Sequence, residues 1–287
     1  MFSKTVVAAI LALTLVTMAC GINVNLPVEE ISTGPTQTVP INIPAPDVDT
    51  TNLTIEFGAG SLDVEPGAVN ALVEGQATYN VEDLKPEVSV TGGDVLLKSG
   101  KLEVRGFPPL RAKNIENEWD LKFGSQPMNL TIKAGAYQGN IELGGLALRS
   151  LVVNDGAAEV NLEFSQPNLL EMADLTYTTG ASQVELSGLA NANFTTMNFN
   201  SGAGDYTLDF SGQLKRDAFV TVESGISQVT IIGPRGVNAR VSFEGGLSNV
   251  DQQDAWESSG GSYLLEGSGP TLTIMVKMGA GNLVLKN

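Results

Sequence analysis

The sequence predicts an all-β protein built as a single-stack parallel β-solenoid with coils of about 22 residues. Three observations lead to this prediction. A phrase of the form Φ-x-Φ-x-x-G-x-x-x-Φ-x-Φ, with Φ apolar, occurs in six full and two partial copies along the 287 residues. From residue 135 to residue 246 the glycines of successive copies are 21 to 24 residues apart. Beyond the first 50 residues, no segment shows the i, i+3, i+4, i+7 apolar pattern that is typical of amphipathic helices.

Each copy consists of two short predicted strands on either side of one glycine. In VTVESGISQVTI, apolar residues alternate with polar ones on both sides of Gly225. Alternation indicates strands with one buried face, so the apolar residues should point toward the solenoid axis. The glycine should form the corner between the two strands, where it can adopt a positive φ without a Cβ penalty. The corner glycines predicted in this way are Gly58, Gly135, Gly156, Gly180, Gly202, Gly225, Gly246 and Gly279.

The period also separates the solenoid from other repeat folds. About 22 residues are too few for two helices or for a four-stranded propeller blade. They suit one coil of a solenoid, in which each repeat stacks on the one before it. An antiparallel sandwich is the alternative all-β fold, but it does not predict a repeated phrase of constant length.

The first residues are typical of an export signal. Lys4 precedes an apolar run from residue 6 to 18, which is too short to span a bilayer comfortably. The segment 1–19, followed by Cys20, resembles a bacterial lipoprotein signal, although Thr17 stands where that family prefers leucine. The resemblance implies that Cys20 is lipidated. An ordinary export signal that leaves a free Cys20 is the alternative.

Composition sets the remaining domain boundaries. Residues 21–50 contain five prolines, four acids and no basic residue, so we expect residues 20–50 to form an extended tether that carries the lipid. Residues 51–287 should form the solenoid head, with irregular segments at 98–122 and 251–270. The segment 251–270 contains Trp256 and is expected to cover part of the solenoid as a cap or flap.

The segment 98–122 is the one candidate for a ligand site. It contains six of the 16 basic residues and Trp119. One interpretation is a binding face for an acidic or sugar ligand, made by Arg105, Arg111, Lys113 and Trp119. The other is an inserted hairpin or end coil, with solvated charges and with Trp119 packed on the core.

Charge and residue types exclude several functions. The formal net charge of −16 argues against nucleic acid as a partner and against docking onto anionic lipid or polysaccharide. Because the chain has no histidine and one cysteine, it has no Cys/His zinc site and no Ser-His-Asp or Cys-His catalytic set. We therefore expect no enzyme activity, no cofactor and no metal. Asp205 and Asp209 leave a calcium-dependent polysaccharide lyase as an alternative.

Three stretches give a resemblance to a known family. They are LTIEFGAGSLDVEPGA, NEWDLKFGSQPMNLTIKAGAYQGNIELGGLALRSLVV and LSGLANANFTTMNFNSGAGDYTLDFSG, within residues 50–287. The sequence resembles the toast-rack domain family of bacterial envelope β-solenoids, which includes the C-terminal part of envelope-stress regulators and adhesin heads. The resemblance implies a right-handed solenoid in the cell envelope and brings no catalytic residues.

The expected function is that of a non-enzymatic cell-envelope lipoprotein, which presents its solenoid as an interaction or scaffold surface in envelope-stress sensing or adhesion. It should be exported and lipid-anchored to the bacterial cell membrane or outer membrane, where its partner is an unidentified envelope protein. A carbohydrate-binding or carbohydrate-active solenoid is the alternative. Self-association through the solenoid ends is also expected, because the last strand finishes near Asn287 and should leave an open edge.

Overall fold

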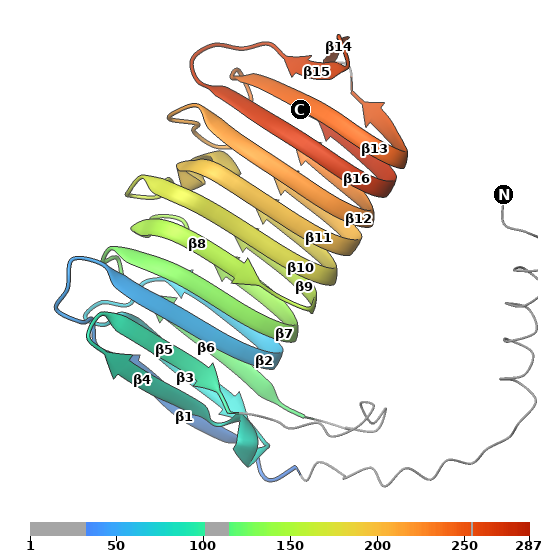
Figure 1. The fold of residues 1–287 in the computed structure, drawn as a ribbon. Helices are drawn as coiled ribbons and strands as arrows, with labels where there is room; N and C mark the ends of the chain where they lie inside the picture. Colours follow the sequence, from blue (N-terminus) through green and yellow to red (C-terminus); the bar gives the residue numbers. More distant parts are fainter. Residues whose placement is uncertain (1–32, 101–114, 254) are drawn as a thin grey trace, which may run out of the picture. The chain divides into compact units, whose positions relative to one another are not determined.

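The computed structural model describes residues 33–100, 115–253 and 255–287, and strands make up most of them (Figure 1). Two short 3₁₀ helices, η1 (Glu82–Leu84) and η2 (Leu189–Ala192), are also present. No helix among the described residues is long and apolar enough to cross a membrane. The strands are β1 (Gln37–Ile43), β2 (Thr51–Pro66), β3 (Val73–Tyr79), β4 (Pro86–Thr91), β5 (Asp94–Ser99), β6 (Asn117–Phe123), β7 (Met128–Glu142), β8 (Leu148–Asn154), β9 (Ala157–Glu163), β10 (Met172–Ser187), β11 (Phe194–Asp209), β12 (Ala218–Ile232), β13 (Asn238–Gln252), β14 (Glu257–Ser259), β15 (Ser262–Leu265) and β16 (Thr271–Lys286).

Each coil of the solenoid is one long strand that bends at a corner glycine, or two strands separated there. We call the part before the glycine the first arm and the part after it the second arm. In β10 the corner lies at Gly180, and both arms pair in parallel with β11, Leu175 beside Met197 and Val184 beside Tyr206. The repeated phrase is therefore one coil, as the sequence predicts, and like positions of successive coils lie side by side.

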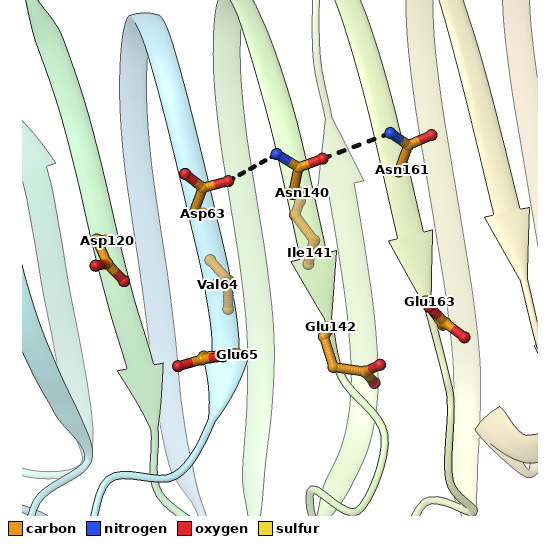
Figure 2. A pocket seen from close by; sticks show the side chains of 9 residues that line it. All are labelled: Asp63, Val64, Glu65, Asp120, Asn140, Ile141, Glu142, Asn161 and Glu163. Carbon is orange, nitrogen blue, oxygen red and sulfur yellow. Dashed lines mark hydrogen bonds between the residues drawn. The ribbon is translucent and has the colours of Figure 1, made fainter.

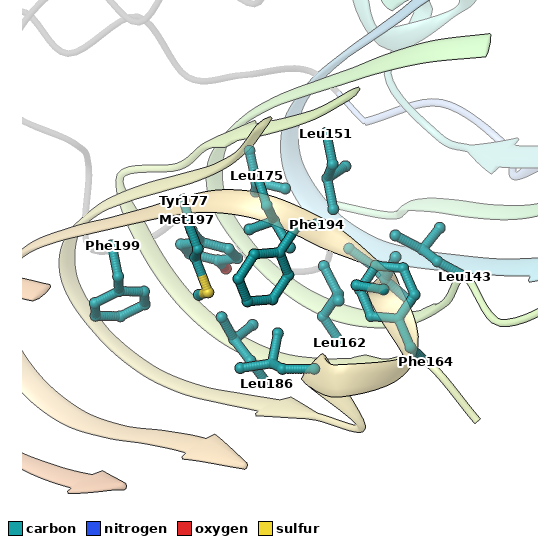
Figure 3. Packing of buried hydrophobic residues seen from close by; sticks show 14 of the residues in the cluster. Leu143, Leu151, Leu162, Phe164, Leu175, Tyr177, Leu186, Phe194, Met197 and Phe199 are labelled. Carbon is teal, nitrogen blue, oxygen red and sulfur yellow. The ribbon is translucent and has the colours of Figure 1, made fainter. Parts of the chain in front are cut away.

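The apolar residues of the phrase form a continuous core between the two arms (Figure 3). Leu175 and Met197 point inward from first arms, and Leu162 and Leu186 point inward from second arms. All four are almost completely buried. Fully burying a side chain of this kind is worth about 1.5–3 kcal/mol, and every coil contributes several. The stack of coils therefore supplies the burial that no single coil has alone.

The corner glycines lie in one column, but the structure corrects the reason given for them. None of the eight is among the glycines with positive φ. Instead, all of them except Gly58 approach the carbonyl oxygen of a neighbouring corner glycine, so that a Cβ at Gly180 would lie 2.4 Å from Gly156 O. A side chain is excluded because the neighbouring coil occupies its place. Positive φ occurs two residues later in three coils, at Gly60, Gly204 and Gly281.

The spatial order of the coils differs from their sequence order at both ends of the stack. The strand β2 lies between the coil made of β5 and β6 and the coil β7. At the other end the C-terminal strand β16 lies between β12 and β13 (Figure 1). The expectation that the last strand leaves an open edge is therefore wrong, because β16 pairs along its length on both sides.

Antiparallel strands cover one end of the stack and part of the other. At one end β4 pairs with β5, while β3 pairs with β6 and β1 pairs with β3. At the other end the hairpin of β14 and β15 covers the first arm of β13 over Ala239–Ser242. The side chain of Trp256 is buried here and donates a hydrogen bond from Nε1 to Lys286 O at 2.9 Å. The predicted irregular segment 251–270 thus contains a capping hairpin.

Two predicted boundaries are corrected at the β1 end. Residues 37–43 were assigned to the extended tether, but they form strand β1, with Ile41 and Ile43 buried. The five prolines obscured a strand whose residues alternate on one face. The predicted irregular segment 98–122 is partly regular, because β5 continues to Ser99 and β6 begins at Asn117. In this coil the described strands end at Ser99 and resume at Asn117, whereas each of the other coils has a glycine at its corner.

Candidate interaction surface

The residues predicted as a ligand site are not brought together by the described part of the structure. Arg105, Arg111 and Lys113 lie outside the described residues, as does the predicted lipidation site Cys20. Trp119 is 1% exposed and meets Phe57 edge to face, with ring centroids 5.2 Å apart. A buried indole cannot stack on a sugar, so the expectation that Trp119 faces a ligand is wrong. The alternative, packing on the core, is what the structure shows.

The outward side chains of the arms form two walls with very different charge. We define the first-arm wall as the outward residues of the first arms and of β5 and β8, and the second-arm wall as those of the second arms and of β6 and β9. The first-arm wall is neutral, with five acids and five bases. They are Glu56, Asp94, Asp174, Glu223 and Glu244, and Lys98, Lys133, Arg149, Arg240 and Lys277.

Ion pairs between neighbouring strands link several charges on the first-arm wall. Lys133 Nζ lies 3.0 Å from Glu56 Oε1, and Lys277 Nζ lies 3.3 Å from Glu223 Oε1. Lys98 Nζ lies 2.8 Å from Glu87 Oε2 on β4; the hydrogen bond and the attraction between the charges raise the pKa of Lys98 and lower that of Glu87. Since these pairs are exposed, water and salt screen their attraction, and each contributes little to stability. Their effect is to balance the wall's charge.

The second-arm wall is strongly acidic. It carries eleven carboxylates and two lysines, a net charge of −9 out of the chain's −16. The carboxylates belong to Asp63, Glu65, Glu118, Asp120, Glu142, Glu159, Glu163, Glu185, Asp205, Asp209 and Asp251, and the lysines are Lys122 and Lys286. Strands in a sheet are about 4.8 Å apart, less than the screening length of about 8 Å at physiological salt. The fields of neighbouring carboxylates therefore add along the wall.

Figure 2 shows a shallow hollow on the second-arm wall, across β6, β2, β7 and β9. One row of side chains begins at Asp120 and continues through Asp63, Asn140 and Asn161. Asn140 Nδ2 donates to Asp63 Oδ1 at 2.8 Å, and Asn161 Nδ2 donates to Asn140 Oδ1 at 3.5 Å. The two amides continue the hydrogen-bonded row without adding further negative charge beside Asp63.

A second row of this hollow contains Glu65, Glu142 and Glu163. Lys122 Nζ lies 2.7 Å from Glu65 Oε1, and this contact raises the pKa of the lysine. Glu142 Oε1 instead accepts hydrogen bonds from Gly144 N and Ser165 N. Like charges directly opposite each other on adjacent strands are destabilising, and Glu142 lies beside Glu163. A cationic partner would relieve this repulsion.

Among the described residues no group of three or more Asp, Glu, His or Cys side chains is arranged to hold a metal ion. Asp205 and Asp209, which left calcium open as an alternative, both lie on β11 in the second-arm wall. Acids that recur on the second arms of several coils favour a partner that is extended and carries several positive charges.

A separate polar cluster lies inside the corner next to Gly156. Asp155 Oδ2 accepts hydrogen bonds from Tyr177 at 2.7 Å and from Tyr137 at 3.5 Å. Burial raises the pKa of Asp155, although the hydroxyls of Thr179, Tyr177 and Tyr137 act in the opposite direction. Burial also raises the pKa of both tyrosines, so their hydroxyls stay protonated as donors. Asp155 Oδ1, by contrast, is buried without a hydrogen-bond partner at this break between β8 and β9.

The charge difference between the walls was available in the sequence but was not predicted from it. Dividing each repeat at its corner glycine shows that acids gather after the glycine, as Glu159 does after Gly156 and Asp205 after Gly202. The net charge of −16 does not show this division, because it sums the charges of both walls and of the rest of the chain.

The chain belongs to the toast-rack family. The family model for the N-terminal domain of toast_rack (DUF2154) matches residues 32–171 and 168–232, which is more than half of the chain. This confirms the resemblance stated from the sequence and the β-solenoid fold that it implies. No curated protein matched the chain in a sequence search.

A comparison with solved structures gave several matches. A putative cell adhesion protein from Clostridium sporogenes is 18% identical and aligns with a TM-score of 0.51, over 88% of this chain and 99% of that one. A putative lipid binding protein from Parabacteroides distasonis is 12% identical, with a TM-score of 0.38 over 87% and 97% of the two chains. A putative adhesin from Parabacteroides merdae is 13% identical, with a TM-score of 0.37 over 88% and 97%.

Proposed function

We propose that this protein is a non-enzymatic, adhesin-like surface protein, and that its second-arm wall binds a basic partner on a neighbouring cell or in the envelope. The observation that carries the proposal is the division of charge, −9 on the second-arm wall and zero on the first-arm wall. Solubility alone requires net charge but does not require that it gather on one wall. The similar structure from Clostridium sporogenes is named as a putative cell adhesion protein, which supports the same class of function.

The proposal includes export and a lipid anchor at Cys20. The described fold begins with β1 at one end of the stack, so an anchor before it would attach the head at that end. Lipidation with more than one acyl chain gives stable membrane attachment. Both long walls would then be available to partners outside the membrane. Metabolic labelling with a palmitate analogue tests this part, because wild type should be labelled and Cys20→Ser should not.

The binding proposal is tested by neutralising three acids on either wall. The second-arm variant carries Glu118→Gln, Glu159→Gln and Asp205→Asn. Its matched control carries Asp94→Asn, Asp174→Asn and Glu244→Gln on the first-arm wall. Both variants change the net charge by the same +3, so only the location differs.

The readout is binding of the immobilised protein to a panel of lysine-rich, arginine-rich and acidic peptides at 50 and 200 mM salt. We expect basic peptides to bind, more weakly at the higher salt, and the second-arm variant to lose more affinity than its control. Equal losses in the two variants would show that overall charge is sufficient and would refute a wall-specific site.

The partner itself is identified by crosslinking the full-length protein in its native membrane, followed by mass spectrometry. Recovery of a sensor kinase or a membrane regulator would assign the wall to envelope-stress sensing. Recovery of a basic surface protein from another cell would assign it to adhesion. The carbohydrate-binding alternative has lost one of its motivations, because Trp119 is buried.

A further inference from the structure

The second arm of β13 together with its corner glycine, residues 246–252, is a strand edge that no described strand covers. On one side it pairs in parallel with β16 as far as Gln252 beside Leu285. On its other side the hairpin strand β15 pairs only with Ala239–Ser242 of the first arm. Alternate residues of the second arm therefore direct their N–H and C=O groups away from the stack, as in any edge strand.

The core is also incompletely covered at this edge. Val250 occupies the inward position that Val229 and Leu283 occupy in the preceding coils, where both are fully buried, yet Val250 itself is only partly buried. Leu247 is 86% exposed. The hydroxyl oxygen of Ser248 is buried without a hydrogen-bond partner. The end coil thus leaves Val250 partly uncovered on its inner face and Leu247 uncovered on its outer face, and a further strand would pack beside both.

The other free edges of the described fold carry features that discourage pairing. The strand β1 contains Pro40, which has no N–H to donate. The strand β4 begins with Pro86 and carries the Glu87–Lys98 ion pair, and β14 has three residues. Short strands, prolines and charges are the usual protections of sheet edges. The second arm of β13 has no proline, no lysine and a single acid, Asp251.

We propose that this edge pairs with the same edge of a second copy of the chain, in an antiparallel, two-fold symmetric dimer. The inner faces of the two copies lie on the same side of the joined sheet only if inward residues of one copy lie opposite inward residues of the other. Because side chains alternate along a strand, this requires one residue to lie opposite the same residue of the second copy, with the two-fold axis between them. The register that pairs all of Gly246–Gln252 places that axis at Asn249. Val250 then lies opposite Ser248, and Leu247 lies opposite Asp251.

Self-complementarity argues for a second copy as the occupant. In this register Asp251 of one copy does not lie opposite Asp251 of the other, so the pairing avoids repulsion between these acids although the chain as a whole is strongly acidic. Two Asn249 side chains face each other, and each amide can both donate and accept a hydrogen bond. The symmetry is of the isologous kind that most homodimers use. Asp251 belongs to the second-arm wall, but the dimer uses the backbone edge of β13 and the basic partner uses the outward face of the other coils, so either proposal can fail without the other.

Charge variants at Leu247 test the register. Leu247→Lys places a cation opposite Asp251 twice in the dimer, and Leu247→Glu places an anion there. Opposite charges across strands are favourable and like charges are unfavourable, so the dimer dissociation constant should fall ~2- to 30-fold with lysine and rise similarly with glutamate. The matched controls are Ile226→Lys and Ile226→Glu, because Ile226 lies in the same column, is 71% exposed and belongs to a coil paired on both sides.

Sedimentation velocity of the full chain with Cys20→Ser, from micromolar to millimolar concentration, measures the dissociation constants. The pairing spans about 23 Å, which is a small interface, so we expect a weak dimer in dilute solution. A monomer at every concentration would overturn the proposal. Equal effects of the same charge at Leu247 and at Ile226 would also overturn it, because they would reflect net charge alone.

A cysteine placed at the proposed axis gives an independent measurement. With Cys20→Ser, the variant Asn249→Cys has one thiol, which the dimer places within disulfide distance of its copy. The control Asn282→Cys lies beside it in the same column, on β16, which is paired on both sides. Under oxidation we expect a covalent dimer of Asn249→Cys and little of Asn282→Cys. Equal crosslinking of both, or mixed disulfides of Asn249→Cys with a foreign protein only, would contradict a second copy.

Discussion

The steric exclusion at the corner glycines can be tested with one methyl group. We choose Gly180→Ala, whose Cβ would lie 2.4 Å from Gly156 O, and Gly58→Ala as its control. Gly58 lies in the same column, but among the described residues its Cβ would meet only Ser99 Oγ, at 3.4 Å. Neither glycine has a positive φ, so both substitutions add the same atoms without backbone strain of that kind.

The expected cost follows from the hydrogen bonds beneath the corner. A Cβ rarely approaches an oxygen closer than 3.0 Å, so the two coils must separate by at least the difference from 2.4 Å, about 0.6 Å. Gly180 N and Ala181 N both donate to Gly156 O at 3.0 Å, and this shift would break both bonds. Losing two bonds at about 1 kcal/mol each and adding about 1 kcal/mol of strain destabilises the folded variant. The less flexible unfolded chain stabilises it by about 0.4–1 kcal/mol. The net destabilisation of Gly180→Ala is about 2 kcal/mol.

Urea unfolding followed by tryptophan fluorescence measures both variants, because Trp119 and Trp256 are buried in the folded state. We expect Gly58→Ala to be as stable as wild type, or more stable by a few tenths of a kcal/mol, since only the unfolded-state term applies. If Gly180→Ala and Gly58→Ala unfold within about 0.5 kcal/mol of each other, close approach is not the reason for the glycine column.

Three further predictions concern buried polar groups. Asp155→Asn should become more stable relative to wild type as pH rises. Burial raises the folded-state pKa of Asp155, so the protonated acid stabilises the wild-type fold at low pH. The wild type loses this contribution as pH rises through the raised pKa, whereas the asparagine variant does not. Urea midpoints of both proteins at pH 3.5, 5 and 7 measure this, and a constant difference would contradict it. Tyr177→Phe removes the 2.7 Å hydrogen bond to the same carboxylate and should cost about 1.5–3 kcal/mol at pH 7, and less at low pH. Trp256→Phe leaves a smaller ring and removes the hydrogen bond to Lys286 O, so it should cost about 2 kcal/mol in the same assay, and an unchanged midpoint would show that the hairpin does not stabilise the stack.

The candidate surface was only partly predictable. The sequence contains every acid of the second-arm wall, and dividing the repeats at their glycines separates Glu159 and Asp205 from Asp174. The environment of Trp119 was not predictable, because an aromatic residue among basic ones is compatible with a binding face and with a core strand. Its burial depends on Phe57, which precedes it by 62 residues and packs against it across the stack.

The sequence by itself determined the all-β fold, the length of a coil, the inward residues and the eight corner glycines, because these depend on a short phrase that each coil repeats. Only the tertiary structure decided which coils are neighbours. Since all copies share one pattern, the repeated phrase does not indicate whether β13 or β16 lies beside β12, and the structure pairs β12 with β16. In the observed order, the capping hairpin pairs with β13, and Trp256 donates a hydrogen bond to Lys286 O at the end of β16. For the same reason only the structure revealed that neighbouring carbonyl groups exclude side chains from the corners, and that the second arm of β13, not the C-terminal strand, provides the free edge.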